Sequence, residues 1–204
     1  RAPLKRIFYT PGKDSVEELL TEARRLKIPC QEVSEHVLAK MSSTETPQGI
    51  LAVVQQHDRT WDDVKLDSRL FLVIDGIQDP GNLGSILRTA LACGITEVCL
   101  TQGTVDLYNP KVLRSTMGAI FAVTALRDQT PERVLEECRK RALNLLVADM
   151  GGDVVYETDI KEKLPVALVV GNEGNGPSPL FKEHAALKVA IPMANEVESL
   201  NVGV

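Results

Sequence analysis

The stretch that decides the fold is Leu70-Phe71-Leu72-Val73-Ile74, which is followed by Asp75-Gly76. Five further short apolar runs follow it along the chain, at residues 97–100, 121–125, 144–148, 166–170 and 187–191. Helical periods separate the runs, at residues 82–92, 110–117, 131–142 and 179–185. Runs that are apolar throughout suit strands covered on both faces. The pattern therefore predicts an α/β domain built on a parallel sheet.

A shorter α/β stretch precedes this pattern. It predicts strands at residues 6–10, 29–33 and 49–55, and helices at residues 14–26 and 34–41. Residues 58–68 are polar, rich in aspartate and without a sustained apolar period, so we expect a linker there. Two domains follow, at residues 1–57 and 69–204. The first is marginal in size for folding alone, and we expect it to lack an N-terminal strand and helix.

Composition restricts the class of protein only broadly. The chain has 204 residues, of which 44% are hydrophobic and 25% charged, as in ordinary soluble globular proteins. No apolar run approaches the ~20 residues of a membrane span, and the N-terminus does not resemble a secretory signal, so we expect a cytoplasmic protein. Cys30, Cys93, Cys99 and Cys138 lie far apart without a C-x-x-C pair or a nearby histidine, which predicts reduced thiols and no metal site.

Charge leaves the question of a nucleic-acid partner open. The formal net charge of -5 argues mildly against such a partner, because phosphate binding depends on lysine and arginine. Local fields can differ from the net charge, and basic clusters occur at Lys5-Arg6, at Arg24-Arg25-Lys27 and at Arg139-Lys140-Arg141. Each cluster by itself is typical of a solvated helix face.

The loops that follow the apolar runs are where an open parallel sheet binds its ligands. In the loop and helix after the first run, Asn82 is placed either to cap the helix or to take part in chemistry. Six residues later, Arg88 interrupts a helix that otherwise consists of apolar and small residues. This interruption favours a site residue over a solvated one.

Two later segments are also unusual. In residues 171–177, three glycines within six positions allow backbone amides to approach a ligand closely. This segment lacks the Gly-Lys-Ser/Thr of a Walker loop, and its late position and prolines argue against a dinucleotide fingerprint. In residues 191–202, Ser199 and Asn201 stand among apolar residues, where Ser199 either caps a helix or belongs to a site.

In this order and at this spacing, the three segments resemble the signature motifs of the SpoU (TrmH) family of SPOUT RNA 2′-O-ribose methyltransferases. The matching stretches are 82–90, 171–176 and 191–202. The likeness covers residues 70–204 and includes 109–119, while the stretch through residues 46–50 is similar to the family's N-terminal substrate-binding domain. Position 195, commonly glycine in the family, is Asn195 here, and asparagine tolerates positive φ better than most residues.

The resemblance implies a sheet whose last segments form a deep trefoil knot, a homodimer, and S-adenosyl-L-methionine as the methyl donor. It also implies that the family's final helix lies beyond Val204. The residues to which it assigns roles fall into three groups. Donor binding falls to Gly171, Ile191 and Leu200, with Met193, Asn172 and Gly174; catalysis falls to Arg88, Asn82, Glu173, Ser199 and Asn201; RNA contacts fall to Lys5, Arg6, Lys111 and Arg114.

The expected activity is therefore 2′-O-methylation of ribosomal RNA, favoured over tRNA because of the extra N-terminal domain. Large-subunit rRNA is the expected target. A tRNA target and a non-catalytic RNA-binding or ribosome-assembly protein of the same fold are the alternatives. A nucleotide-binding oxidoreductase lacks support, because no early glycine fingerprint is present. Arginine is a poor general base, so we expect Arg88 to grip a phosphate and the developing oxyanion. Glu173 is expected to orient Asn82 or Arg88.

Overall fold

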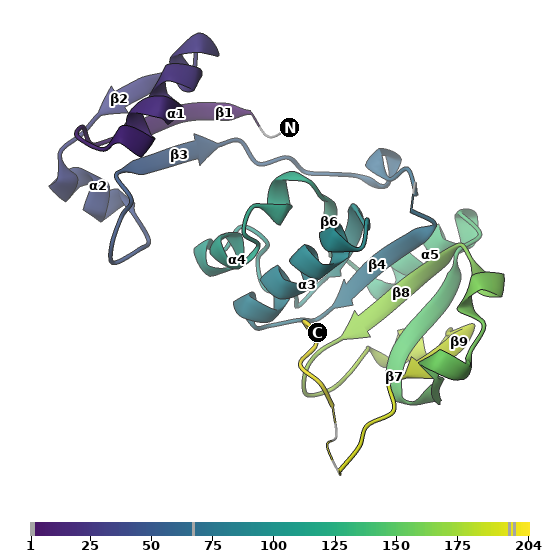
Figure 1. Cartoon of the computed structure of the whole chain (residues 1–204). Coiled ribbons are helices and arrows are strands. Elements are labelled where there is room, and N and C mark those ends of the chain that lie inside the picture. The colour runs from purple at the N-terminus through teal and green to yellow at the C-terminus, as the bar shows by residue number, and fades with distance from the viewer. Residues whose placement is uncertain (1–2, 67, 196, 198) are drawn as a thin grey trace. The chain divides into compact units, whose positions relative to one another are not determined.

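The structure is a computed structural model that describes residues 3–66, 68–195, 197 and 199–204. Its contacts divide the chain into two compact units, Arg1–His57 (unit 1) and Asp58–Val204 (unit 2). Figure 1 shows that each unit has a sheet of its own. Among the helices of the described residues, none is long and apolar enough to cross a membrane.

Unit 1 is a three-stranded sheet packed against a helix. Its elements are β1 (Leu4–Tyr9), α1 (Asp14–Arg25), β2 (Cys30–Glu32), α2 (Glu35–Met41) and β3 (Ile50–Val54). The strand order is β2-β1-β3, in which β1 runs parallel to β2 and antiparallel to β3. The amphipathic helix α1 buries Val16, Leu20 and Ala23 against Ile7 of β1, which gives the unit a small core.

Unit 2 is a six-stranded sheet of order β6-β5-β4-β8-β7-β9, in which each described pairing is parallel. The predicted α/β class with a parallel sheet is therefore confirmed. Its elements are β4 (Leu70–Asp75), α3 (Pro80–Ala92), β5 (Glu97–Thr101), α4 (Pro110–Ser115), β6 (Thr124–Gln129), α5 (Pro131–Lys140), β7 (Asn144–Val154), β8 (Val166–Gly171), α6 (Pro179–Glu183) and β9 (Leu187–Ala190). Short 3-10 turns occur at Trp61–Asp63, Ala119–Phe121, Val155–Glu157 and Ile160–Lys163.

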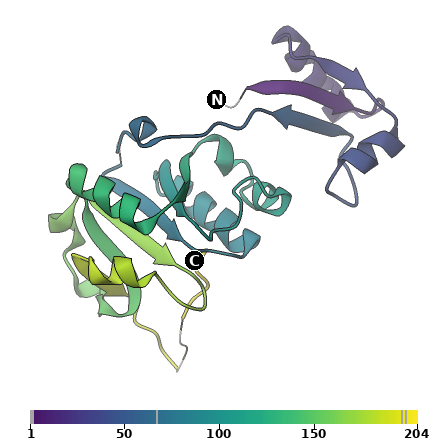
Figure 2. The same ribbon diagram turned by 180° about the vertical axis from the view of Figure 1, so that it is seen from behind.

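The alternation of side chains along β4 explains why this strand is apolar throughout. Phe71 and Val73 join the core beneath α5 and α6, whereas Leu72 and Ile74 join the core beneath α3 and α4. None of the four side chains is more than 5% exposed. Figures 1 and 2 show from opposite sides that helices cover both faces of the sheet. A strand buried on both faces has no polar side, as the sequence pattern indicated.

Two predicted strands differ from the observed ones by three residues or more at one or both ends. The strand expected at residues 121–125 begins only at Thr124, because Gly118, with φ of 90°, starts a 3-10 turn over Ala119–Phe121. The strand expected at residues 144–148 continues to Val154, with a shift in its pairing to β9 between residues 148 and 153. A local turn decided the first boundary and pairing with β9 decided the second, and an apolar run reports neither.

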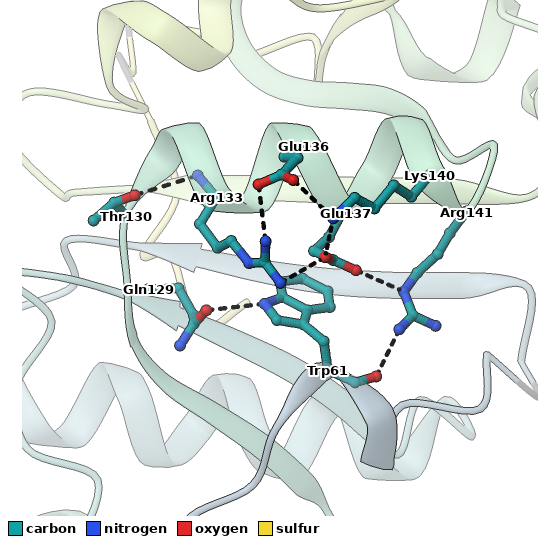
Figure 3. Close-up of polar contacts among 8 residues, drawn as sticks. All are labelled: Trp61, Gln129, Thr130, Arg133, Glu136, Glu137, Lys140 and Arg141. Carbon is teal, nitrogen blue, oxygen red and sulfur yellow. Dashed lines mark hydrogen bonds and ion pairs between the residues drawn. The ribbon is translucent and has the colours of Figure 1, made fainter.

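The segment expected to be a linker packs against unit 2. Trp61 and Val64 are 7% and 6% exposed and belong to the same core cluster as Phe71. The indole N–H of Trp61 donates to Gln129 at 2.9 Å, and Arg141 donates to the carbonyl oxygen of Trp61 at 2.6 Å (Figure 3). Arg141 also donates to the carbonyl oxygen of Val64 at 3.3 Å. One buried indole anchors a segment that has no apolar period, so periodicity could not reveal the packing.

Candidate active site

A buried carboxylate connects the carboxyl ends of three segments of unit 2. Asp75, the last residue of β4, is 6% exposed. One of its oxygens accepts from the hydroxyl of Thr101 at 2.7 Å, and the other accepts from the amide of Ser178 at 2.6 Å. A buried carboxylate is stable only with such partners. Sequence reasoning did not single out Asp75, although a charged residue at the end of an apolar strand was a signal.

The glycine-rich segment 171–177, here called the glycine loop, is held by the side chain of Asn172. Its amide nitrogen donates to the carbonyl oxygen of Gly76 at 2.8 Å, and its carbonyl accepts from the amide of Gly174 at 3.0 Å. A Cβ on Gly171 would lie 2.0 Å from the nitrogen of Pro177, so only glycine fits there. The Asn172 side chain is therefore committed to shaping the loop.

Asn82 does not cap α3, so the capping interpretation of this residue is wrong. The helix begins at Pro80, and the carboxylate of Asp79 caps it by accepting from the amide of Asn82 at 2.8 Å. Proline is well suited to the first helical position, because its missing N–H would have no partner there. The side chain of Asn82 is thus free for another contact. It donates to Glu173 of the glycine loop at 2.7 Å.

Asn201 extends this contact to the C-terminal segment. Its amide nitrogen donates to the side-chain carbonyl of Asn82 at 2.9 Å. A carboxylate can only accept, so the amide nitrogen of Asn82 faces Glu173 and its carbonyl is left for Asn201. The three segments singled out in the sequence therefore meet in one hydrogen-bonded chain, Glu173–Asn82–Asn201.

The C-terminal segment also lies against α3. The carbonyl oxygen of Gly203 accepts from the hydroxyls of Ser85 and Thr89 at 3.2 and 3.4 Å. A Cβ on Gly203 would lie 2.7 Å from the Cβ of Ser85, so the close approach requires glycine. Figure 1 shows this segment, in yellow, ending beside α3. Sequence reasoning missed these three residues, although two hydroxyls four residues apart share one helix face.

Arg88 lies on α3 with its side chain exposed. Within the described part of the chain, its guanidinium makes no hydrogen bond or ion pair. Ser199 is likewise exposed and makes no hydrogen bond to a residue that the structure describes. In the same segment, Ile191 and Leu200 are 50% and 47% exposed. Exposed side chains of Arg88, Ser199, Ile191 and Leu200 therefore lie on α3 and on residues 191–202, two of the segments that the polar chain joins.

Two of the remaining residues singled out in the sequence lie in the C-terminal segment, residues 191–202, and the others are the predicted RNA contacts. Met193 is half-buried, and Asn195 has φ of 57°, as the tolerance of asparagine for positive φ allows. The predicted RNA contacts fall in both units. Lys5 and Arg6 are exposed on β1 of unit 1, and Lys111 and Arg114 are exposed on α4 of unit 2.

The cysteines take no part in this site. All four are free; Cys99 and Cys138 are buried, Cys30 is half-buried and Cys93 is exposed. Burial raises the pKa of the Cys99 thiol above its usual range and raises the pKa of Cys138 to about 12. Among the described residues, no group of three or more histidine, cysteine or acidic side chains could hold a metal ion.

A doubly covered parallel sheet with three loops joined beyond the carboxyl ends of its strands defines an α/β protein of the class whose ligands bind beyond those ends. Residues 69–204 match the model of the SpoU rRNA Methylase family, and residues 1–60 match the model described as RNA 2'-O ribose methyltransferase substrate binding. The chain belongs to the SpoU rRNA methylase family, which confirms the resemblance of its motifs.

Named relatives and a solved structure are similar over most of the chain. An uncharacterized tRNA/rRNA methyltransferase of Synechocystis is 39% identical over 84% of this chain, and the chain spans 62% of that relative. The 23S rRNA (guanosine(2553)-2'-O)-methyltransferase RlmP of Bacillus subtilis is 36% identical over 87% of this chain and 69% of its own length. The SpoU methyltransferase AviRb of Streptomyces viridochromogenes, solved with AdoMet, has a TM-score of 0.85 and 28% identity over 99% of this chain and 78% of its own.

Proposed function

We propose that this chain is an S-adenosyl-L-methionine-dependent RNA 2′-O-ribose methyltransferase that modifies ribosomal RNA of the large subunit. The observation that carries the proposal is the hydrogen-bonded chain Glu173–Asn82–Asn201. It joins the three family segments, and its central residue lies on the helix that presents Arg88, whose guanidinium has no partner among the described residues. The rRNA-modifying relatives support the choice of substrate.

The residues around this chain fit S-adenosylmethionine, which carries an aromatic base and a cationic sulfur. Ile191 and Leu200 leave about half of their surface exposed and can cover an adenine ring. The exposed carboxylate of Glu173 gives the glycine loop a charge that complements a cation. We assign binding to backbone groups of Gly171, Ile191 and Leu200, with Met193 beside them. Asn172 and Gly174 shape the loop, since they already bond to each other.

The chain's own residues must orient a ribose hydroxyl and stabilise the charge that develops on its oxygen. When bound, S-adenosylmethionine supplies a methyl group on a positively charged sulfur. Arginine is a poor general base, so we assign Arg88 a bidentate hold on the neighbouring phosphate and on the developing oxyanion. Ser199 and Asn201 would position the ribose. The donors of Arg88, which are exposed and bind no other residue that the structure describes, suit this role.

We extend the proposal to the assembly of the protein. Gly203 lies against Ser85, which is 118 residues earlier in the chain. Such a return of the last segment across α3 supports a deep trefoil knot. We propose that two copies form a homodimer with the target ribose near their junction. Unit 1 would bind RNA through Lys5 and Arg6 and unit 2 through Lys111 and Arg114, in the cytoplasm, where ribosomes lie.

The test is transfer of tritium-labelled methyl groups to RNA, followed by mapping of ribose methylation in 23S rRNA. We expect label on one ribose with the wild-type chain and none with Arg88→Ala. The matched control is Arg139→Ala, because Arg139 is also an exposed helical arginine without a side-chain partner in the described residues. Full turnover by Arg88→Ala would remove Arg88 from the mechanism. Label in tRNA only, or no label despite tight RNA binding, would contradict the proposed activity.

A further inference from the structure

Residues 58–66, here called the strap, are held to unit 2 along their length. Trp61 is buried, and Arg141 binds the carbonyl oxygens of Trp61 and Val64. Figure 3 shows that Arg141 is itself held by Glu137 of α5. At the far end of the strap, the carboxylate of Glu97 accepts from the amides of Lys65 and Leu66. These contacts make the strap a part of unit 2.

Arg127 of β6 holds the first residue of the strap. Its guanidinium lies 2.5 Å from the carboxylate of Asp58 and 3.8 Å from that of Asp106. The same guanidinium stacks over the ring of Tyr108, 4.7 Å from the ring centroid. The side chain of Arg127 is 24% exposed, whereas that of Asp58 is 88% exposed. Arg127 therefore connects the strap to the loop that contains Asp106 and Tyr108.

That loop, residues 102–109, lies between the candidate active site and a basic helix. Its Val105 amide donates to the carbonyl oxygen of Ile77 at 2.8 Å, and its Thr104 hydroxyl accepts from the amide of Gly76 at 3.1 Å. The loop ends at Asn109, which caps α4, the helix of Lys111 and Arg114. Arg127 thus contacts both the strap and the segment that precedes the basic residues of α4.

The connection from unit 1 to the strap is short. β3 ends at Val54, and the amide of Gln55 still donates to the carbonyl oxygen of Pro3 at 3.1 Å. Only Gln56 and His57 separate Gln55 from Asp58. Three Cα steps span at most about 11 Å. The last hydrogen bond of unit 1 is thus only three residues from Asp58, the first residue of unit 2.

We propose that Arg127 is a positioning residue for the RNA: by holding Asp58, it fixes the point at which unit 1 leaves unit 2, near the loop that leads to α4. The inference rests on the proposed function, in which unit 1 binds RNA and unit 2 transfers the methyl group. Release of Asp58 lets unit 1 occupy more positions and leaves the donor site unchanged. The RNA held by unit 1 then reaches the site less often.

The kinetic test compares Asp58→Asn and Arg127→Gln with the wild type. We expect the KM for RNA to rise about two- to fivefold in both variants, the range for loss of one exposed ion pair. The kcat at saturating RNA and the Kd for S-adenosylmethionine stay unchanged. The control Arg139→Gln removes the same charge as Arg127→Gln without touching the strap, and its KM stays at the wild-type value.

Asp58→Asn separates positioning from direct RNA binding. If Arg127 acted by binding phosphate, the substitution would free its guanidinium and remove a negative charge, so the KM for RNA would fall. A fall or an unchanged KM overturns the proposal. Folding failure is not expected from Asp58→Asn, because the side chain is largely exposed.

A second measurement does not depend on activity. Spin labels on the exposed Cys93 of unit 2 and on Glu18→Cys of unit 1, in a Cys30→Ser background, report the distance distribution between the units. Labelled chain is mixed with excess unlabelled chain, so that only distances within one chain are measured. We expect the distribution to be broader in Asp58→Asn and Arg127→Gln than in the wild type and Arg139→Gln. Equal widths overturn the proposal, whereas broadening without transferase activity contradicts only the proposed function.

Discussion

At the scale of single residues, the site depends on the side-chain amide of Asn82, whose nitrogen and oxygen bind different segments. Asn82 donates to Glu173 and accepts from Asn201, so it connects segments that lie about 90 and 120 residues away in the chain. The carboxylate decides which way this amide faces, because it can only accept hydrogen bonds. Glu173 therefore contributes both a charge and an orientation, and the two contributions can be separated by substitution.

Glu173→Gln should retain most of the activity, and Glu173→Ala should lose about tenfold or more. A glutamine carbonyl can still accept from Asn82, whereas alanine leaves that donor without a partner, and a hydrogen bond to a charged group is worth about 1.5–3 kcal/mol. Isothermal titration with S-adenosylmethionine and methyl transfer assays measure the two variants. Equal losses in both would show that charge, and not orientation, is the contribution of Glu173.

The cysteines should differ in reactivity with iodoacetamide at pH 8. The thiolate is the reactive form, and burial raises the pKa of Cys138 to about 12 and that of Cys99 above its usual range. Both groups therefore stay protonated until the pH exceeds these raised values, whereas Cys93 is exposed. Mass spectrometry of the folded chain should find label on Cys93 first. Labelling of Cys138 at the rate of Cys93 would contradict the buried position.

At the scale of elements, α3 organises the site. One of its faces covers the sheet with Leu83 and Leu87, both fully buried. Other positions carry Asn82, Arg88 and the two hydroxyls that bind Gly203. Because 3.6 residues make one turn, a single helix can present a packing face and a functional face at once. The glycine loop and the C-terminal segment both depend on this helix for their positions.

Gly203→Ala should separate the C-terminal segment from α3. The added methyl group would lie 2.7 Å from the Cβ of Ser85 and 2.8 Å from its hydroxyl, which is too close for either to remain. We expect weaker binding of S-adenosylmethionine with little change in the Tm. The double variant Gly203→Ala with Ser85→Gly removes the clashing atoms and should recover binding in part, at a cost of about 1 kcal/mol for glycine in a helix. No recovery would mean that the contact does not position the segment.

At the scale of the whole molecule, the strap belongs to unit 2, so this unit begins before its first strand. Trp61 is the chain's only tryptophan, and its ring packs on Phe71, with 5.4 Å between the ring centroids. The core of unit 2 therefore includes a residue that precedes its first strand. The buried Glu137, paired with Arg133, Lys140 and Arg141, supports this arrangement from α5 (Figure 3).

Trp61→Ala should destabilise unit 2 by about 3–5 kcal/mol, because it leaves a cavity beside Phe71. Trp61→Phe keeps most of the packing and loses the hydrogen bond to Gln129, so its cost should be about 1 kcal/mol. Urea unfolding of the full chain followed by circular dichroism measures both variants. A midpoint for Trp61→Ala equal to that of the wild type would contradict the anchoring role of the indole.

The sequence by itself determined the class of fold and the residues worth attention. The period and composition of a segment are local properties of the sequence. Because β4 is buried on both faces, its residues Leu70–Ile74 are all apolar, and this run is recognisable in the sequence. Arg88 and Asn201 stand out as polar side chains among apolar ones, and glycines mark residues 171–176, whereas Glu173 was identified only through the family resemblance. The resemblance to a family rested on these same residues.

Only the tertiary structure decided which of these residues meet and what holds them. Asn201 contacts Asn82, and Gly203 contacts Ser85 of α3, in each case more than 100 residues away in the chain. Trp61 is likewise buried by residues from distant parts of the chain. Asp79, and not Asn82, caps α3, because capping depends on where the helix begins. Contacts between distant segments depend on the path of the backbone, and no local pattern records that path.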